Sequence, residues 1–337
     1  VLFPKWVPIS MYKVAYWART TMVPLLVLCS LKARARNPRN VSIRELFVTP
    51  PDQERHYFPP ARGMRKLFLA LDRTVRHLEP LMPKRLRRRA IRHAEAWCAE
   101  RMNGEDGLGG IFPPIVYSYQ MMEVLGYPDD HPLRRDCEDA LEKLLVARPD
   151  GSVYCQPCLS PVWDTAWSTM ALEQARGVAV PEGGGPAGAL RELDERIARA
   201  YDWLAERQVN DLRGDWIENA PADTQPGGWA FQYANPYYPD IDDSAVVTAM
   251  LDRRGRTHRN ADGSHPYAAR VARALDWMRG LQSRNGGFAA FDADCDRMYL
   301  NAIPFADHGA LLDPPTEDVS GRVLLCFGVT KRADDRA

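Results

Sequence analysis

The amino-acid sequence predicts an all-α protein whose helical hairpins close into an α/α barrel, in two barrel portions. Apolar residues recur at helical spacing in one segment after another, and almost no segment alternates as a strand does. Loops rich in proline, glycine and polar residues separate these segments. A repeated motif ends some of the helices, and stacked helical hairpins of this kind close into a barrel.

The helical pattern divides into ten segments. They are residues 10–31, 61–79, 84–102, 114–125, 132–146, 162–176, 189–207, 243–254, 266–281 and 319–329. Residues 36–60 are rich in proline and arginine and are expected to form a loop. We expect residues 1–155 to be part of the first barrel and residues 159–337 to be part of the second, with the two meeting near residues 150–160.

The repeated motif occurs at residues 199–216 and again at 273–288. Each copy contains Arg-Ala-x-Asp-Trp, then a glutamine five residues after the tryptophan, and it closes on Trp216 or Phe288. A glutamine can bond the unpaired backbone groups at a helix end, and an aromatic ring can stack over it. The alternative is chance similarity between amphipathic helices.

Composition and cysteine spacing exclude several classes of function. The chain of 337 residues has 44 basic and 44 acidic side chains, so no overall charge favours nucleic acid as a partner. Cys155 and Cys158 form an isolated C-x-x-C without histidine at ligand spacing, which argues against zinc and for free thiols in a reducing compartment. The acids from Asp292 to Asp296 begin like a calcium loop, but the sixth and twelfth positions fail. We expect neither a metal nor a cofactor.

An acid motif with an aromatic run before it lies in residues 227–247. Asp240, Asp242 and Asp243 fall within four residues, and Pro239 favours a helix that starts just after it, with Asp240 as the N-cap. Crowded carboxylates in an apolar site cannot all ionise, so at least one pKa should be raised. A neutral carboxylic acid facing aromatic rings can protonate an alkene, and the rings can stabilise the resulting carbocation. The alternative is a helix cap followed by two solvated acids.

These residues resemble the acid motif of the squalene–hopene cyclases, which are class II triterpene cyclases. Residues 286–322 and 160–167 resemble the same family, and the paired repeats look like its QW repeats. The resemblance implies an α/α barrel that cyclises squalene to a hopanoid-type pentacycle with no redox or metal cofactor. It covers nearly all of this chain but only the middle of the much longer family members, so we expect an internal fragment that can be inactive alone.

The resemblance also assigns roles in the acid motif. Asp242 matches the proton donor, and Asp240 and Asp243 match the partners that hold and acidify it. Asp318 matches an acid of the same network. Arg322 stands where well-known members have histidine. An arginine can polarise Asp240, but it is always charged and cannot relay a proton.

Four aromatic side chains match residues that line the family's cavity, where they stabilise cations: Trp17, Trp163, Phe231 and Phe291. Asp164 follows Trp163 as it does in the family. Phe291 replaces a tyrosine of some members and keeps the π face, while Phe112 replaces a glutamine near the terminating water. The quenching of the final cation is therefore left open. Each aromatic, taken alone, is more often a core residue.

Alternative functions are a class II diterpene cyclase, which shares the acid motif, and an inactive or scaffold fragment of a cyclase. Residues 61–79 are amphipathic and precede the basic run Lys84–Arg89. We therefore expect the region near residues 58–92 to lie on the membrane surface, monotopic and on the cytoplasmic side, without a spanning helix. An ordinary packed helix is the alternative. A homodimer is a further partner that the sequence leaves open.

Overall fold

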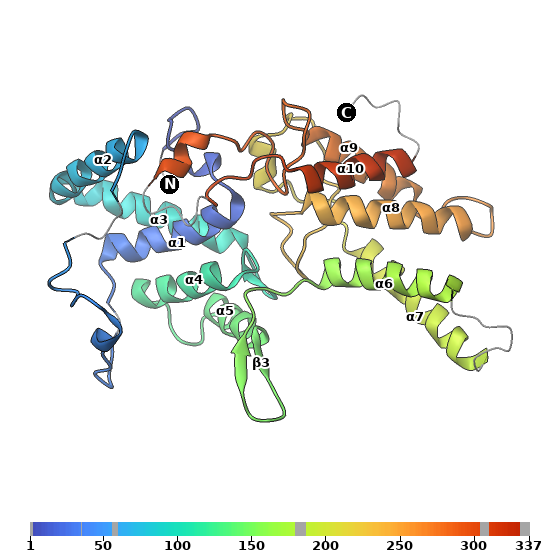
Figure 1. The fold of residues 1–337 in the computed structure, drawn as a ribbon, viewed down its shortest axis with the longest axis horizontal. Coiled ribbons are helices and arrows are strands. Elements are labelled where there is room, and N and C mark those ends of the chain that lie inside the picture. Colours follow the sequence, from blue (N-terminus) through green and yellow to red (C-terminus); the bar gives the residue numbers. More distant parts are fainter. Residues whose placement is uncertain (1–2, 35, 56–59, 179–186, 304–309, 331–337) are drawn as a thin grey trace.

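The structure is a computed structural model that describes residues 3–34, 36–55, 60–178, 187–303 and 310–330. Within these ranges it contains ten α-helices and two short β-hairpins, which confirms the predicted all-α class (Figure 1). Five helices precede residue 150 and five follow it. The two groups lie side by side along the longest axis of the molecule.

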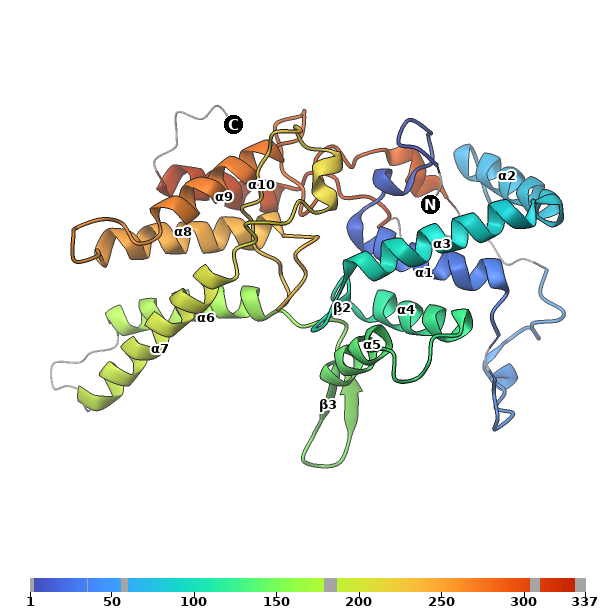
Figure 2. The same ribbon diagram turned by 180° about the vertical axis from the view of Figure 1, so that it is seen from behind.

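The N-terminal group is built around α1. Its helices are α1 (Tyr16–Leu31), α2 (Met64–Leu78), α3 (Lys84–Arg101), α4 (Phe112–Leu125) and α5 (Pro132–Lys143). Helix α1 packs against α3 and α4, and α4 packs against α5 (Figures 1 and 2). Their apolar faces form one core, which includes Val23, Val27, Trp97, Ile115 and Met121.

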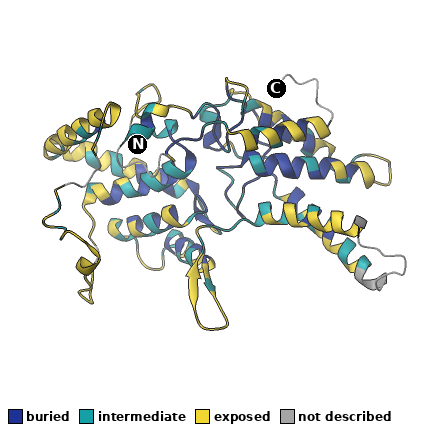
Figure 3. Ribbon diagram, in the orientation of Figure 1, coloured by how far each residue is buried: buried dark blue, intermediate teal, exposed yellow. Residues whose placement is uncertain are grey.

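The C-terminal group is built around α8. Its helices are α6 (Pro161–Val178), α7 (Ala187–Glu206), α8 (Ile241–Thr257), α9 (Ala268–Gly280) and α10 (Glu317–Val329). Helix α8 packs against α6, α9 and α10 and is buried along most of its length (Figure 3). The largest side chains of this second core are Trp216, Trp229 and Trp277.

The helix bounds agree with the predicted segments to within a few residues, with two differences. The first helix begins at Tyr16, because residues Met11–Lys13 form a separate 3-10 turn. The segment predicted at 132–146 ends at Lys143, and β3 (Leu145–Ala147) then pairs antiparallel with β4 (Val153–Cys155). Gly151 has a φ of 83° in the turn between these strands, a conformation that glycine adopts without strain.

The remaining short elements lie in the connections. Strands β1 (Met102–Asn103) and β2 (Gly107–Leu108) form the other hairpin. Single 3-10 turns occur at Arg44–Leu46, Glu79–Leu81, Asp215–Glu218 and Met298–Ala302.

The repeated motif links neighbouring helices of the second core. The side-chain amide of Gln208 donates to the carbonyl of Gly227 at 2.8 Å and to that of Arg270, in the first turn of α9, at 2.9 Å. Trp216, which closes the first copy, meets Trp277 of the second edge to face at 6.0 Å. Gln208 therefore bonds the chain just before the second copy rather than the end of its own helix, and the closing ring of the first copy packs on the tryptophan of the second.

A buried ionic network joins the two groups of helices. Arg19 of α1 contacts Asp215 at 3.1 Å and Asp292 at 3.0 Å, and Arg101 of α3 contacts Asp215 at 2.7 Å. The hydroxyl of Tyr238 donates to Asp215 at 2.7 Å. Burial alone would raise the pKa of Asp215, but the hydrogen bonds and charges of Arg101 and Arg19 hold it below its ordinary value.

Helix α2 is exposed along most of its length, and Phe68 is its one buried residue (Figure 3). Its apolar side chains face solvent, with Leu67 59% exposed and Val75 and Leu78 each 55% exposed. Across the described ranges, no helix combines the length and the apolar character needed to cross a bilayer.

Candidate active site

The acid motif forms the N-terminus of α8, and backbone contacts hold it from both sides. The N–H of Asp240 donates to the carbonyl of Trp229 at 2.7 Å, and the N–H of Ile241 donates to that of Ala290 at 2.8 Å. Asp240 is the N-cap, as predicted: its Oδ1 accepts the N–H groups of Asp242 and Asp243. The cap fixes the three carboxyls relative to one another.

The three carboxyl groups of the motif differ in burial and in partners. Asp240 and Asp243 are 7% and 1% exposed, whereas Asp242 is more exposed. Arg322, from α10, holds both oxygens of Asp242 with its Nε and Nη2 atoms, the latter at 2.8 Å. The same guanidinium also reaches Asp318 at 3.2 Å. A two-point contact of this kind fixes the orientation of the Asp242 carboxyl.

Burial therefore acts on the two carboxyls that lack a cation. It raises the pKa of Asp240 to about 8, and the negative charge of Asp242 adds to the rise. Burial, followed by the charge of Asp240, raises the pKa of Asp243 well above its ordinary value. Oδ1 of Asp243 is buried without a hydrogen-bond partner among the described residues, which also disfavours its ionised form. The motif thus retains protons at neutral pH.

Arg322 acts on Asp240 through its charge and not through a hydrogen bond. The sequence suggested that Arg322 polarises Asp240, but its hydrogen bonds go to Asp242 and Asp318. The physical reason is the cap: Asp240 turns its carboxylate back onto the first turn of α8, while Asp242 projects from that turn towards α10. The arginine thus offsets part of the negative charge that raises the pKa of Asp240.

An aromatic cluster lies beside the motif, and it includes two of the predicted residues. Phe291 packs on Tyr16 with ring centroids 4.1 Å apart, and Trp17 meets both rings edge on at 5.9 Å. Tyr16 stacks on Tyr238 at 4.5 Å. The indole N–H of Trp17 donates to the carbonyl of Ala310 at 2.7 Å, which fixes the orientation of that ring.

A buried carboxyl holds the loop that carries Phe291. Asp313 accepts three successive backbone N–H groups, those of Ala290 at 3.1 Å, Phe291 at 2.8 Å and Asp292 at 3.0 Å. Burial raises the pKa of Asp313 to about 7, and the charge of Asp292 adds to the rise, while these hydrogen bonds oppose it. The loop is thus tied to Asp313, to Ile241 of α8 and, through Asp292, to Arg19.

The remaining predicted residues are distributed around this centre. Trp163, on α6, lies next to the acid motif, with the guanidinium of Arg322 5.6 Å from its ring centroid. Asp164 is exposed and accepts the hydroxyl of Ser160 at 2.8 Å. Phe231 is half-buried, and its carbonyl accepts the N–H of Val162. Phe112 is 40% exposed at the start of α4, where its N–H donates to the carbonyl of Pro157 at 2.8 Å.

Sequence reasoning missed several residues of the site. Tyr16 was overlooked beside Trp17, and Tyr238 was seen only as part of the aromatic run. Asp313 gave no signal except its place directly before the Pro314-Pro315 pair. Arg19 and Asp215 meet across 196 positions of sequence, and no local pattern can indicate such a pair.

The surroundings of the motif are apolar on one side. A hollow of about 340 Å³ opens beside Arg322, between α6, α8 and α10, and includes Trp167, Met170, Val246 and Leu325 in its lining. The described residues contain no group of three or more His, Cys, Asp or Glu side chains placed to hold a metal ion. Cys155 and Cys158 are free thiols.

Comparison with known proteins places these features in a family. The family model of the squalene-hopene cyclase C-terminal domain matches residues 159–337, and that of the N-terminal domain matches residues 1–150. The chain belongs to the squalene–hopene cyclase family. The two groups of helices are thus portions of the family's α/α toroid domains.

Curated members of the squalene–hopene cyclase family support this assignment. A probable squalene–hopene cyclase of Sinorhizobium fredii is 48% identical over 96% of this chain, and the squalene–hopene cyclase of Zymomonas mobilis is 46% identical over 96%. That of Alicyclobacillus acidocaldarius is 35% identical over the same share. The chain spans about half the length of these relatives, 47–48% in each case.

The raised pKa of Asp240 predicts a pH-dependent cost in stability. An aspartate has a pKa near 3.9 when unfolded, so its contribution to folding is full below about pH 4 and is lost as the pH rises through about 8. Asp240→Asn keeps an oxygen for the cap and does not titrate. We compare the free energy of unfolding of Asp240→Asn with that of wild type at each pH. We expect this difference to favour the variant more at pH 8 than at pH 5, by about 1 kcal/mol or more.

Urea unfolding of both proteins at the two pH values measures this difference. The exposed Asp211→Asn is the matched control and should give the same small change at pH 5 and pH 8. An Asp240→Asn effect that is equal at both pH values would show that Asp240 is ionised in the folded protein.

Proposed function

We propose that the protein cyclises squalene to a hopanoid-type pentacyclic triterpene by protonating a terminal alkene. The observation that carries the proposal is the pairing of a proton-retaining acid motif with the aromatic cluster of Tyr16, Trp17, Tyr238 and Phe291. The names of the relatives support squalene as the substrate, and none of the relatives reported above is named as a diterpene cyclase.

The proposed proton donor is Asp242, the most exposed of the three carboxyls. Asp240 and Asp243, the neighbouring carboxyls that burial favours in the neutral form, can supply Asp242 with the proton that it transfers. The alkene then takes this proton with its π electrons, Asp242 is left as the carboxylate, and the positive charge appears on carbon. Arg322 stabilises the carboxylate that the step leaves behind.

The aromatic cluster then acts on the cation. Each ring closure moves the positive charge along the substrate, and a π face close to that charge lowers its energy. Phe291 presents such a face, and the hydrogen bonds from its loop to Asp313 hold it in place. Trp163 is the second proposed cation-stabilising ring, on the side of α6. Phe231 and Phe112 stay predictions as cavity residues.

We further propose that the protein lies on one face of a membrane, on its cytoplasmic side. The exposed apolar side chains of α2 and the basic start of α3 support it, because such a pair can enter one leaflet and meet anionic headgroups. A substrate insoluble in water would then enter from the lipid. The homodimer stays a prediction that no contact in the structure tests.

The central prediction concerns Asp242 and Phe291. In a preparation whose wild-type form turns over squalene, Asp242→Asn should lower the rate by at least about a thousandfold, because it removes the transferable proton and keeps the size of the side chain. Phe291→Ala should lower the rate about tenfold and release partly cyclised products, because one cation-stabilising face is lost. Products are identified by gas chromatography and mass spectrometry.

Asp211→Asn serves as the control for these variants and should keep the wild-type rate and products. Wild-type turnover in Asp242→Asn would refute the proposed donor. If Phe291→Ala slowed the reaction without any change in its products, the ring would have no role in guiding the cation.

The membrane proposal predicts flotation with vesicles of anionic lipid at low salt. Leu71→Ser together with Val75→Ser should leave most of the protein in the soluble fraction, because both side chains are exposed on α2 and supply the apolar contact. Leu145→Ser with Val153→Ser, also exposed but on the β3–β4 hairpin, is the matched control and should float as wild type does. Equal flotation of both double variants would rule out α2 as the contact.

A further inference from the structure

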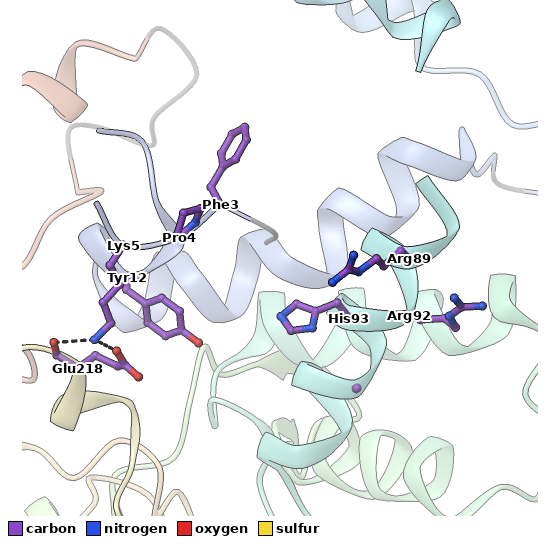
Figure 4. Close-up of a pocket in the computed structure, with 9 residues that line it drawn as sticks. Phe3, Pro4, Lys5, Tyr12, Arg89, Arg92, His93 and Glu218 are labelled. Carbon is purple, nitrogen blue, oxygen red and sulfur yellow. Dashed lines mark hydrogen bonds and ion pairs between the residues drawn. The ribbon is translucent and has the colours of Figure 1, made fainter. Parts of the chain in front are cut away.

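A basic hollow lies between the N-terminal segment and α3, and none of its lining residues belongs to the acid motif. We call it the α3 hollow. Its volume is about 610 Å³ (Figure 4). It is lined by Phe3, Pro4, Lys5, Tyr12, Arg89, Arg92, His93, Ala96 and Glu218.

The charges of the α3 hollow do not cancel. Lys5 forms an ion pair with Glu218, and these two neutralise each other. Arg89, Arg92 and His93 make no ion pair with any residue that the structure describes. Positions 89 and 93 lie four residues apart on α3, so Arg89 and His93 share one face of the helix.

The side chains also give the α3 hollow a polar and an apolar side. Arg89 and His93 extend from α3 towards the N-terminal segment, while Arg92 points away along the rim (Figure 4). Phe3, Pro4 and the ring of Tyr12 form the opposite wall. An anionic group placed between Arg89 and His93 would therefore have an apolar surface on its other side.

We propose that the α3 hollow binds the phosphate group of a phosphate monoester. A guanidinium donates two parallel N–H bonds, which match two phosphate oxygens, and the imidazole of His93 can donate to a third. A monoester carries nearly two negative charges at neutral pH, and this matches several cations better than a single carboxylate does. The group can come from free phosphate or from a lipid such as phosphatidic acid, whose chains would meet Phe3 and Pro4.

Isothermal titration calorimetry in phosphate-free buffer at low salt tests the proposal. The probes are inorganic phosphate and dihexanoyl phosphatidic acid kept below its micelle concentration. Wild type should bind at least one of them with one site per chain. Arg89→Gln combined with His93→Gln should weaken that binding at least tenfold. The matched control is Arg259→Gln combined with His258→Gln, an exposed pair after α8 that should bind as wild type does.

The two probes distinguish the source of the phosphate. Binding of phosphatidic acid at least tenfold tighter than inorganic phosphate supports a lipid ligand, and equal affinities support free phosphate; either result supports the phosphate site. If wild type bound neither inorganic phosphate nor dihexanoyl phosphatidic acid, the proposal would be overturned. Undiminished binding by the Arg89 and His93 double variant would overturn it as well, because the phosphate would then lie elsewhere.

Discussion

Two buried arginines share one carboxylate where the two groups of helices meet, and the site depends on this contact. Asp215 pairs with both Arg19 and Arg101, and each arginine has a second acidic partner, Asp292 for Arg19 and Glu100 for Arg101, so none of these charges is left unpaired. Removing one partner from such a network costs about 3–5 kcal/mol, because it strands a buried charge. Arg19 also holds Asp292, next to Phe291, and Asp215 accepts the hydroxyl of Tyr238, two residues before the acid motif. The packing of the helices and the aromatic cluster are therefore fixed together.

Asp240 is both the N-cap of α8 and a buried acid, and these two roles favour opposite protonation states of its carboxyl. As the N-cap of α8 it accepts two backbone N–H groups, which favours its ionised form. Burial and the neighbouring charge of Asp242 favour its neutral form, and they prevail. The protein therefore retains an acid that an ordinary helix would ionise. Arg322 limits the repulsion between the neighbouring carboxyls by pairing with Asp242.

Local patterns predicted much of this structure, and long-range contacts account for what they missed. The helices follow from apolar spacing within single segments, and the cap at Asp240 follows from Pro239 and the acids after it. Which carboxyl Arg322 holds depends on how α10 lies against α8, and spacing does not contain that information. Asp313 and Arg19 act on residues far along the chain. The β3–β4 hairpin was missed because its strands are only three residues long.

The central claim is that the acid motif holds a protonated carboxyl at neutral pH. Infrared difference spectroscopy across a pH titration tests it most directly, because a neutral carboxyl has a C=O stretch that a carboxylate lacks. The account predicts a carboxyl band that persists at pH 7, disappears with a midpoint near 8 and is absent from Asp240→Asn. Loss of all carboxyl bands by about pH 6 in wild type, or a set of carboxyl bands that is unchanged in Asp240→Asn, would contradict it.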